Sequence, residues 1–161
     1  MDIKAFAKAS TPKKGSEEQK ESTPFFNAKA AYEQKKQGLL KEFATFRDNK
    51  KLGLGLKKET SNLFRNRLDA TQKIDVKKFN QVISVDKEHL IAEVEGMTTY
   101  EELVKETLKY DCLPCVVPEL KTITIGGDLA GVGIESSSFR YGLVHETIEE
   151  YEILLGDGRI V

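Results

Sequence analysis

The 161-residue sequence lacks several features that would each point to a class of protein. No stretch approaches the roughly 18–20 consecutive apolar residues of a membrane span, and the N-terminus has no apolar core of the signal-peptide kind. The only histidines are His89 and His145, and the only cysteines are Cys112 and Cys115. A zinc site would need more ligands close together than these supply. We therefore expect a cytoplasmic protein with no membrane span in this chain and no metal.

The two cysteines form the sequence Cys112-Leu113-Pro114-Cys115. A spacing of this kind is redox-active mainly at the start of a helix in a thioredoxin-like context. Here two valines and Pro118 follow instead. Packed, reduced thiols are therefore favoured over a redox pair.

The sequence also has little excess of charge of one sign, since its net charge is −1. Residues 1–52 hold 12 Lys and Arg against 7 Asp and Glu, whereas residues 53–161 hold 13 against 19. A basic segment can attract nucleic acid or anionic lipid. Here the lysines alternate with acids and glutamines, and no aromatic residue is interleaved with a basic cluster. A solvated face is the favoured interpretation, and we expect no nucleic-acid partner.

The length suits one domain, preceded by two N-terminal segments. Residues 1–22 are rich in Lys, Glu, Ser and Thr and predict a disordered lead-in. Thr23 and Pro24 predict the start of a helix, as an N-cap followed by proline at the first helical position. This helix occupies the segment 23–50 and runs to about Phe46. Its apolar stripe is imperfect, so it either packs on the domain or is a partner-binding arm.

Residues 51–161 predict an ordered α+β unit. Alternating apolar residues indicate two strands over 79–85 and 90–95, joined as a hairpin. Thr98 or Thr99 can cap a following helix. Ile123 and Ile125 then predict a strand that leads into a glycine-rich loop. Another strand is expected over 147–155, and a last one after the turn at 156–158.

The glycine-rich loop, residues 124–142, reads TIGGDLAGVGIESSSFRYG and gives the main indication of a ligand. Four of its glycines, at 126, 127, 131 and 133, permit φ > 0 and a close approach to a ligand. Consecutive exposed N–H groups can form an anion-binding concavity, and three serines add hydroxyl donors. The loop lacks the lysine of a P-loop, and its spacing is not the dinucleotide fingerprint. These residues predict a phosphate or pyrophosphate held by neutral donors, with a plain turn between strands as the alternative.

This part of the chain resembles FAD-linked oxidoreductases of the vanillyl-alcohol oxidase family, which have a PCMH-type FAD-binding domain. The run GIESSS, the later Tyr-Gly pair and the sequence Pro-Glu-Leu at 118–120 carry the resemblance. It looks most like the delta(24)-sterol reductase branch and covers about residues 53–161. The resemblance implies a partial PCMH-type domain: the first subdomain and the start of the second. The cofactor contacts that it implies are Thr124, Ile125, Gly126, Gly127, Asp128, Leu129, Ala130, Gly131, Val132, Gly133, Ile134, Glu135, Ser136, Ser137, Ser138, Tyr141 and Gly142.

An earlier segment, LKKETSNLFR at 56–65, lies where such flavoproteins place their first cofactor loop. It lacks the glycine-rich turn of many members and the histidine that bonds the flavin in covalent ones. This departure argues for non-covalent FAD. Thr60, Ser61 and Asn62 offer short polar donors, and Arg65 could offset phosphate charge by a forked contact. The alternative is that Ser61 or Asn62 caps a helical turn.

The resemblance implies an FAD-dependent oxidoreductase that acts on a C=C or C–C bond of a small, lipid-like molecule. Members continue well beyond this length, so we expect an N-terminal fragment whose catalytic residues lie in the missing C-terminal part. Glu135 is expected to bond backbone N–H groups rather than catalyse, and His145 to be a partly buried structural residue rather than a general base. Tyr141 packs either on the cofactor or on the sheet. A non-catalytic nucleotide- or anion-binding module, and an assembly fragment that needs a partner, remain as alternatives.

Overall fold

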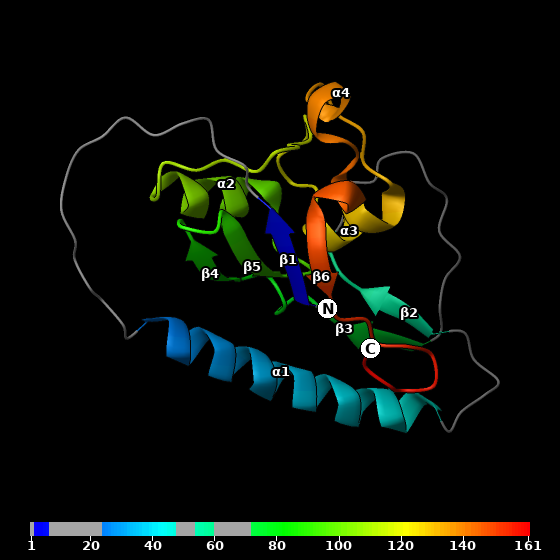
Figure 1. Ribbon diagram of the computed structural model, residues 1–161. Coiled ribbons are helices and arrows are strands. Elements are labelled where there is room, and N and C mark those ends of the chain that lie inside the picture. The colour runs from blue at the N-terminus through cyan, green and yellow to red at the C-terminus, as the bar shows by residue number, and fades with distance from the viewer. Residues whose placement is uncertain (1, 7–23, 48–53, 60–71) are drawn as a thin grey trace.

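The computed structural model describes residues 2–6, 24–47, 54–59 and 72–161, and Figure 1 shows their arrangement. The first half of this part of the chain contains β1 (Asp2–Phe6), α1 (Pro24–Arg47), β2 (Leu54–Lys57), β3 (Gln72–Asp75), β4 (Val82–Asp86) and β5 (Ile91–Glu95). The second half contains α2 (Tyr100–Leu108), α3 (Ile125–Gly131), α4 (Ser138–Tyr141), the 3-10 helix η1 (Val144–Thr147) and β6 (Ile148–Tyr151). The expected α+β class is confirmed. None of the described helices is long and apolar enough to cross a membrane.

Four strands form an antiparallel sheet in the order β4-β5-β1-β6. The predicted hairpin is present as β4 and β5. The N-terminal strand β1 lies between β5 and β6, with Asp2 opposite Glu95 and Ile3 opposite Tyr151. The prediction of a disordered lead-in is therefore wrong for residues 2–6, while residues 7–22 lie outside the described part. A separate parallel pair is formed by β2 and β3.

Two apolar clusters hold helices against the two faces of the four-stranded sheet. Ala92 and Val94 of β5 pack with Tyr100, Leu103 and Ile125 of α2 and α3. The second cluster joins α1 to β3 and β4 and contains Tyr32, Leu39, Phe43, Ile74, Phe79 and Ile83. In Figure 1, α1 accordingly runs along one side of the sheet, and α2 and α3 lie on the other.

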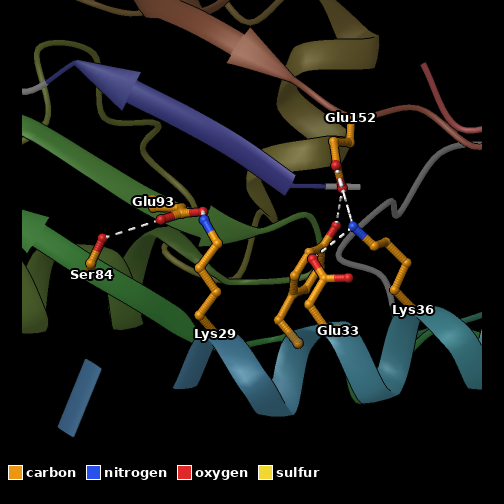
Figure 2. A network of polar contacts seen from close by, with 7 residues as sticks. Lys29, Glu33, Lys36, Ser84, Glu93 and Glu152 are labelled. Atoms are coloured by element: carbon orange, nitrogen blue, oxygen red, sulfur yellow. Dashed lines mark hydrogen bonds and ion pairs between the residues drawn. The ribbon is translucent and has the colours of Figure 1, made fainter. Parts of the chain in front are cut away.

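Helix α1 packs on the domain, which decides between the two interpretations of its sequence. Its lysines contribute to this contact as well as its apolar residues. Lys29 pairs with Glu93 at 2.8 Å, and Lys36 lies 3.2 Å from Glu152 (Figure 2). Lys35 lies 2.8 Å from Glu95, whose side chain is only 1% exposed. The face of α1 that carries these lysines is therefore not simply solvated.

The segment from Tyr100 to Gly131 forms helices on both sides of the predicted strand. Thr99 caps α2, and its side chain accepts a hydrogen bond from the Glu102 N–H, as the sequence predicted. The strand expected at Ile125 is wrong, because Thr124 caps a helix there and its hydroxyl accepts from the Gly127 N–H. Only an isolated bridge between Thr99 and Thr124 remains of it.

The chain after α3 returns to the sheet. The strand expected over 147–155 is shorter, since η1 precedes β6 and β6 ends at Tyr151. Beyond it, Ile153 and Val161 exchange two backbone hydrogen bonds around the predicted turn at 156–158. This terminal turn lies beside β3 and the end of α1 in Figure 1.

Candidate functional site

A pocket of about 940 Å³ lies where several distant segments of the chain meet. Its walls come from α1, the β2–β3 pair, the turn after β5, the segment 120–124, α3 and the terminal turn. Most lining side chains are apolar, and Leu39, Phe43, Leu56 and Ile74 are examples. The polar lining includes Thr124 and the backbone of the two glycines that follow Ile125. An apolar pocket with a few convergent polar groups is the usual form of a small-molecule site.

The predicted glycine-rich loop contributes to this pocket only through its first half. Its lining residues are Thr124, Gly126, Gly127, Asp128, Ala130 and Gly131. Ile125 and Leu129 turn into the sheet-facing core instead. The remaining predicted contacts do not line it: Val132, Gly133, Ile134, Glu135, Ser136, Ser137, Ser138, Tyr141 and Gly142.

The glycines at 126, 127, 131 and 133 do not adopt the positive φ that the sequence predicted, whereas Gly142, at the end of the loop, has φ of 81°. Gly126 and Gly127 are helical, and the left-handed residue at the end of α3 is Val132, with φ of 56°. The Gly126 N–H donates to the Gly96 carbonyl at 2.8 Å, and the Gly127 N–H donates to Thr124 Oγ1 at 3.3 Å. The expected row of exposed amides is therefore wrong here, because a helix cap and a neighbouring turn already accept from these donors.

Two of the three serines fix the chain rather than face the pocket. The Ser137 hydroxyl donates to the Cys115 carbonyl at 2.8 Å, and the Ser138 hydroxyl accepts from the Glu135 N–H at 3.0 Å. Cys112 is buried, with its Sγ 3.3 Å from the Tyr110 carbonyl oxygen. The Ser137 bond ties the serine run to the cysteine segment, and both cysteines are thiols.

Asp128 is a buried acidic residue of the site. It is 7% exposed, and its Oδ2 has no hydrogen-bond partner. Burial raises the pKa of this carboxyl above its usual value, although a hydrogen bond with Tyr100 acts in the opposite direction. Tyr100 is itself buried, and burial together with the nearby Asp128 charge raises its pKa as well. Gly133 leaves room for the carboxyl, since a Cβ there would lie 2.0 Å from Oδ1.

Glu135 and His145 differ in how well the sequence predicted them. Burial, then the charge of Asp128, raises the pKa of Glu135, and a hydrogen bond from the Glu119 backbone partly offsets this. That contact agrees with the expected structural role of Glu135. His145 is exposed in η1, so the prediction of a partly buried residue is wrong. Tyr141 is half-buried beside the Arg140 guanidinium, and its predicted contact stays a prediction.

The earlier predicted contacts, Thr60, Ser61, Asn62 and Arg65, lie outside the described residues. Lys58 and Glu59, directly before them, do line the pocket. Sequence reasoning missed the walls given by α1 and by the terminal turn. The apolar stripe of α1 indicates that this helix packs against something, but the sequence of the helix does not predict which segment it contacts. Among the described residues, no cluster of three or more His, Cys, Asp or Glu side chains could hold a metal ion.

Comparisons with known proteins point to one kind of cofactor. A protein-family model described as FAD binding domain matches residues 51–161. The chain is 38% identical over 88 residues to a delta(24)-sterol reductase of Pisum sativum, covering 55% of this chain and 16% of that protein. It is 36% identical over 80 residues to the delta(24)-sterol reductase of Homo sapiens, covering 50% and 16%.

A more distant relative has a different printed activity. The chain is 30% identical over 69 residues to cytokinin dehydrogenase 1 of Arabidopsis thaliana, covering 43% of this chain and 12% of that protein. In all three comparisons the chain spans about a sixth or less of the relative's length. The similarity therefore concerns one part of these proteins.

Proposed function

Because the chain belongs to the family of FAD binding domains, we propose that its pocket holds FAD non-covalently with the diphosphate at Thr124, Gly126 and Gly127. The observation that carries this proposal is that the family-matched loop and a large apolar pocket meet at the start of α3. A volume of about 940 Å³ suits a large ligand, since ligand pockets usually measure about 300–1,000 Å³. FAD is the cofactor of the family, as the resemblance predicted.

The residues of the pocket fit such a group in their chemistry. The apolar walls suit a flat ring system, and Lys58 is a cation among the lining residues, of the kind that can offset phosphate charge. Asp128 also lines the pocket, and its buried Oδ2 lacks the hydrogen-bond partner that a buried polar atom normally has. The amides of Gly126 and Gly127 fit less well, because each already has an acceptor. Of these two bonds, the Gly127 contact is the longer and the more readily exchanged. The remaining predicted contacts, including Thr60, Ser61, Asn62 and Arg65, stay predictions.

We further propose that the whole protein is an FAD-dependent oxidoreductase that reduces a C=C bond of a lipid-like substrate. This rests on the similarity to two delta(24)-sterol reductases. When bound, FAD supplies the hydride chemistry, and the residues described here bind and orient it. The cytoplasmic location remains a prediction.

The binding proposal is tested with a glycine pair in the full-length protein. Gly127→Ala puts a Cβ at the pocket wall, 2.9 Å from Thr124 Oγ1. We expect the Kd for FAD, measured by flavin fluorescence, to rise about tenfold, or about 1.4 kcal/mol. The matched control is Gly38→Ala in α1, where the nearest atom outside its helix is Lys78 Nζ at 3.7 Å. Circular dichroism checks that both variants fold. A wild-type protein that binds no FAD, or equal affinity in the two variants, contradicts the proposal.

A further inference from the structure

Two consecutive lysines of α1 tie this helix to two distant parts of the chain. Lys35 Nζ lies 2.8 Å and 2.9 Å from the two carboxylate oxygens of Glu95, at the end of β5. Lys36 Nζ lies 3.2 Å from Oε2 of Glu152, directly after β6 (Figure 2). The Tyr32 hydroxyl donates to the same oxygen of Glu152. Three polar groups of one helix therefore hold it against the ends of two strands.

These contacts lie next to the walls of the pocket. On α1, the lining residue Leu39 is four residues after Lys35, so the two lie on the same face of the helix. The residue after Glu95 and the residue after Glu152 both line the pocket as well. The two ion pairs thus join the wall formed by α1 to the turn after β5 and to the terminal turn.

The turn after β5, residues 95–98, is in addition fixed to α3. The Gly96 carbonyl accepts from the Gly126 N–H at 2.8 Å, and the Thr98 carbonyl accepts from the Ile125 N–H at 2.9 Å. A continuous series of polar contacts therefore runs from α1 through this turn to the opposite wall of the pocket. The position of α1 and the shape of the pocket are not independent of each other.

Burial of the acids decides how much each pair contributes. Glu95 is 1% exposed, whereas the Glu152 side chain is 36% exposed. Removing the cation from a buried carboxylate is far more disruptive than removing it from an exposed one, so Lys35 should have the larger effect. The pair of Lys29 with Glu93 joins the same helix to the same strand, but Lys29 is mostly exposed. Neither Glu93 nor the residue after it lines the pocket.

We propose that α1 is the element that closes the FAD pocket, and that Lys35, Lys36 and Tyr32 are positioning residues that set the affinity for the cofactor. They act by holding α1 against the other walls. The proposal rests on the proposed function, since it takes FAD as the ligand of this pocket. Because α1 precedes the matched residues 51–161, a segment outside the matched domain completes the site. A ligand that contacts all the walls binds the docked arrangement of α1, so its apparent affinity falls with the fraction of molecules in that arrangement.

The test measures the Kd for FAD in the full-length protein by flavin fluorescence, at a temperature where circular dichroism shows each variant to be folded. Lys35→Met should raise the Kd about tenfold, as expected when about one folded molecule in ten has α1 docked. Lys35→Arg retains a cation with a fork that can bond both oxygens of Glu95, and should restore the Kd to within about twofold of the wild type. Lys29→Met is the matched control and should leave the Kd unchanged.

A second control separates positioning from a loss of overall stability. Val85→Ala, in β4, removes apolar contacts on the face of the sheet away from α1. It should lower the Tm, as loss of a packed side chain does, and leave the Kd unchanged, since its folded molecules keep the complete pocket.

A double variant keeps the inference testable if Lys35→Met does not fold. Tyr32→Phe combined with Lys36→Met removes both donors to Glu152 and preserves the buried ring at position 32. Its Kd should rise by about threefold or more, through the same fall in the docked fraction.

An unchanged Kd in a folded form of either variant overturns the inference and leaves the proposed FAD site standing. An equal rise in Kd for Val85→Ala and Lys35→Met also overturns it, because affinity would then follow overall stability. A wild-type protein that binds no FAD contradicts the proposed function and the inference together.

Discussion

At the scale of the residue, Gly133 is required by a neighbour rather than by its own backbone. It lies directly against Asp128, and a Cβ added there would approach Cγ to 2.5 Å as well as Oδ1 to 2.0 Å. The carboxyl cannot easily move away, because it is 7% exposed. Gly133 does not line the pocket, so its role is to make room for a buried acid.

Gly133→Ala should therefore destabilise the protein by about 1–3 kcal/mol, as overpacking of a closed site does. Thermal unfolding without FAD measures this loss as a lower Tm. Gly131→Ala is the control, because no atom lies within 4 Å of its Cβ and it ends a helix. That variant should gain up to about 0.5–1 kcal/mol from the replacement of a helical glycine. The Gly133 penalty should shrink in the Asp128→Ala background. Equal losses at 131 and 133 would show that the carboxyl is not the cause.

The sequence predicted these residues as a group and not their individual roles. Glycine at 126 and 127 was interpreted as freedom for φ > 0, yet both residues are helical, because Thr124 is placed to cap them. The burial of Asp128 has no local signature, since an aspartate that directly follows two glycines is typical of an exposed turn. The hydroxyls of Ser137 and Ser138 likewise form hydrogen bonds within the protein. The acceptor of the Ser137 bond, the Cys115 carbonyl, is 22 residues away in the sequence, so no local pattern predicts it.

At the scale of the element, α1 docks on the sheet through a mixed surface. Tyr32, Leu39 and Phe43 are buried in it. Beside them, Lys29 and Lys35 reach Glu93 and Glu95 of β5. This explains why the helix shows an imperfect apolar stripe. The opposite face of β5, with Ala92 and Val94, is apolar, and the hairpin was predicted correctly from that alternation.

The two lysines of this surface should contribute very different amounts of stability. Glu95 is 1% exposed and also accepts from the Gln81 N–H at 2.8 Å. Lys35→Met leaves the Glu95 carboxylate buried beside an apolar side chain. We expect the free energy of unfolding to fall by about 1–3 kcal/mol. Lys29→Met is the matched control, because Lys29 is 57% exposed, and its loss should stay below about 1 kcal/mol. Urea unfolding measures both, and a larger loss for Lys29→Met would contradict this account of the docking.

Errors at this scale have one physical source, which is contact between segments far apart in the chain. The composition of residues 1–22 predicts a lead-in, but β5 and β6 offer two strand edges that pair with residues 2–6. The expected strand at Ile125 fits its apolar pattern. The backbone N–H of Ile125 instead donates to the Thr98 carbonyl, and a helix follows. Local propensity cannot predict these contacts, because the strands that pair with residues 2–6 and the carbonyl that accepts from Ile125 lie elsewhere in the sequence.

At the scale of the whole molecule, the pocket brings together parts of the chain that no single motif connects. The family was predicted from the GIESSS run and its surroundings, and the comparisons confirm it. The wall of the pocket formed by residues 124–131 was predicted together with the family. The other walls come from α1, which precedes the matched residues 51–161, and from the terminal turn. A ligand in this pocket would therefore contact segments separated by more than a hundred residues.

Hydrogen exchange should detect this arrangement directly. With FAD at about 100 times its Kd, the bound form is stabilised by about 2.7 kcal/mol. We expect slower exchange around Leu39 and Phe43 of α1, in β3, and across the terminal turn at 153–156, because all three line the pocket. The internal control is the turn at 87–90 between β4 and β5, which lies outside the lining and exchanges by local opening. Its rate should not change. Protection confined to residues 124–131 would mean that the cofactor touches α3 alone, and that the pocket formed with α1 and the terminal turn is not where its ring system lies.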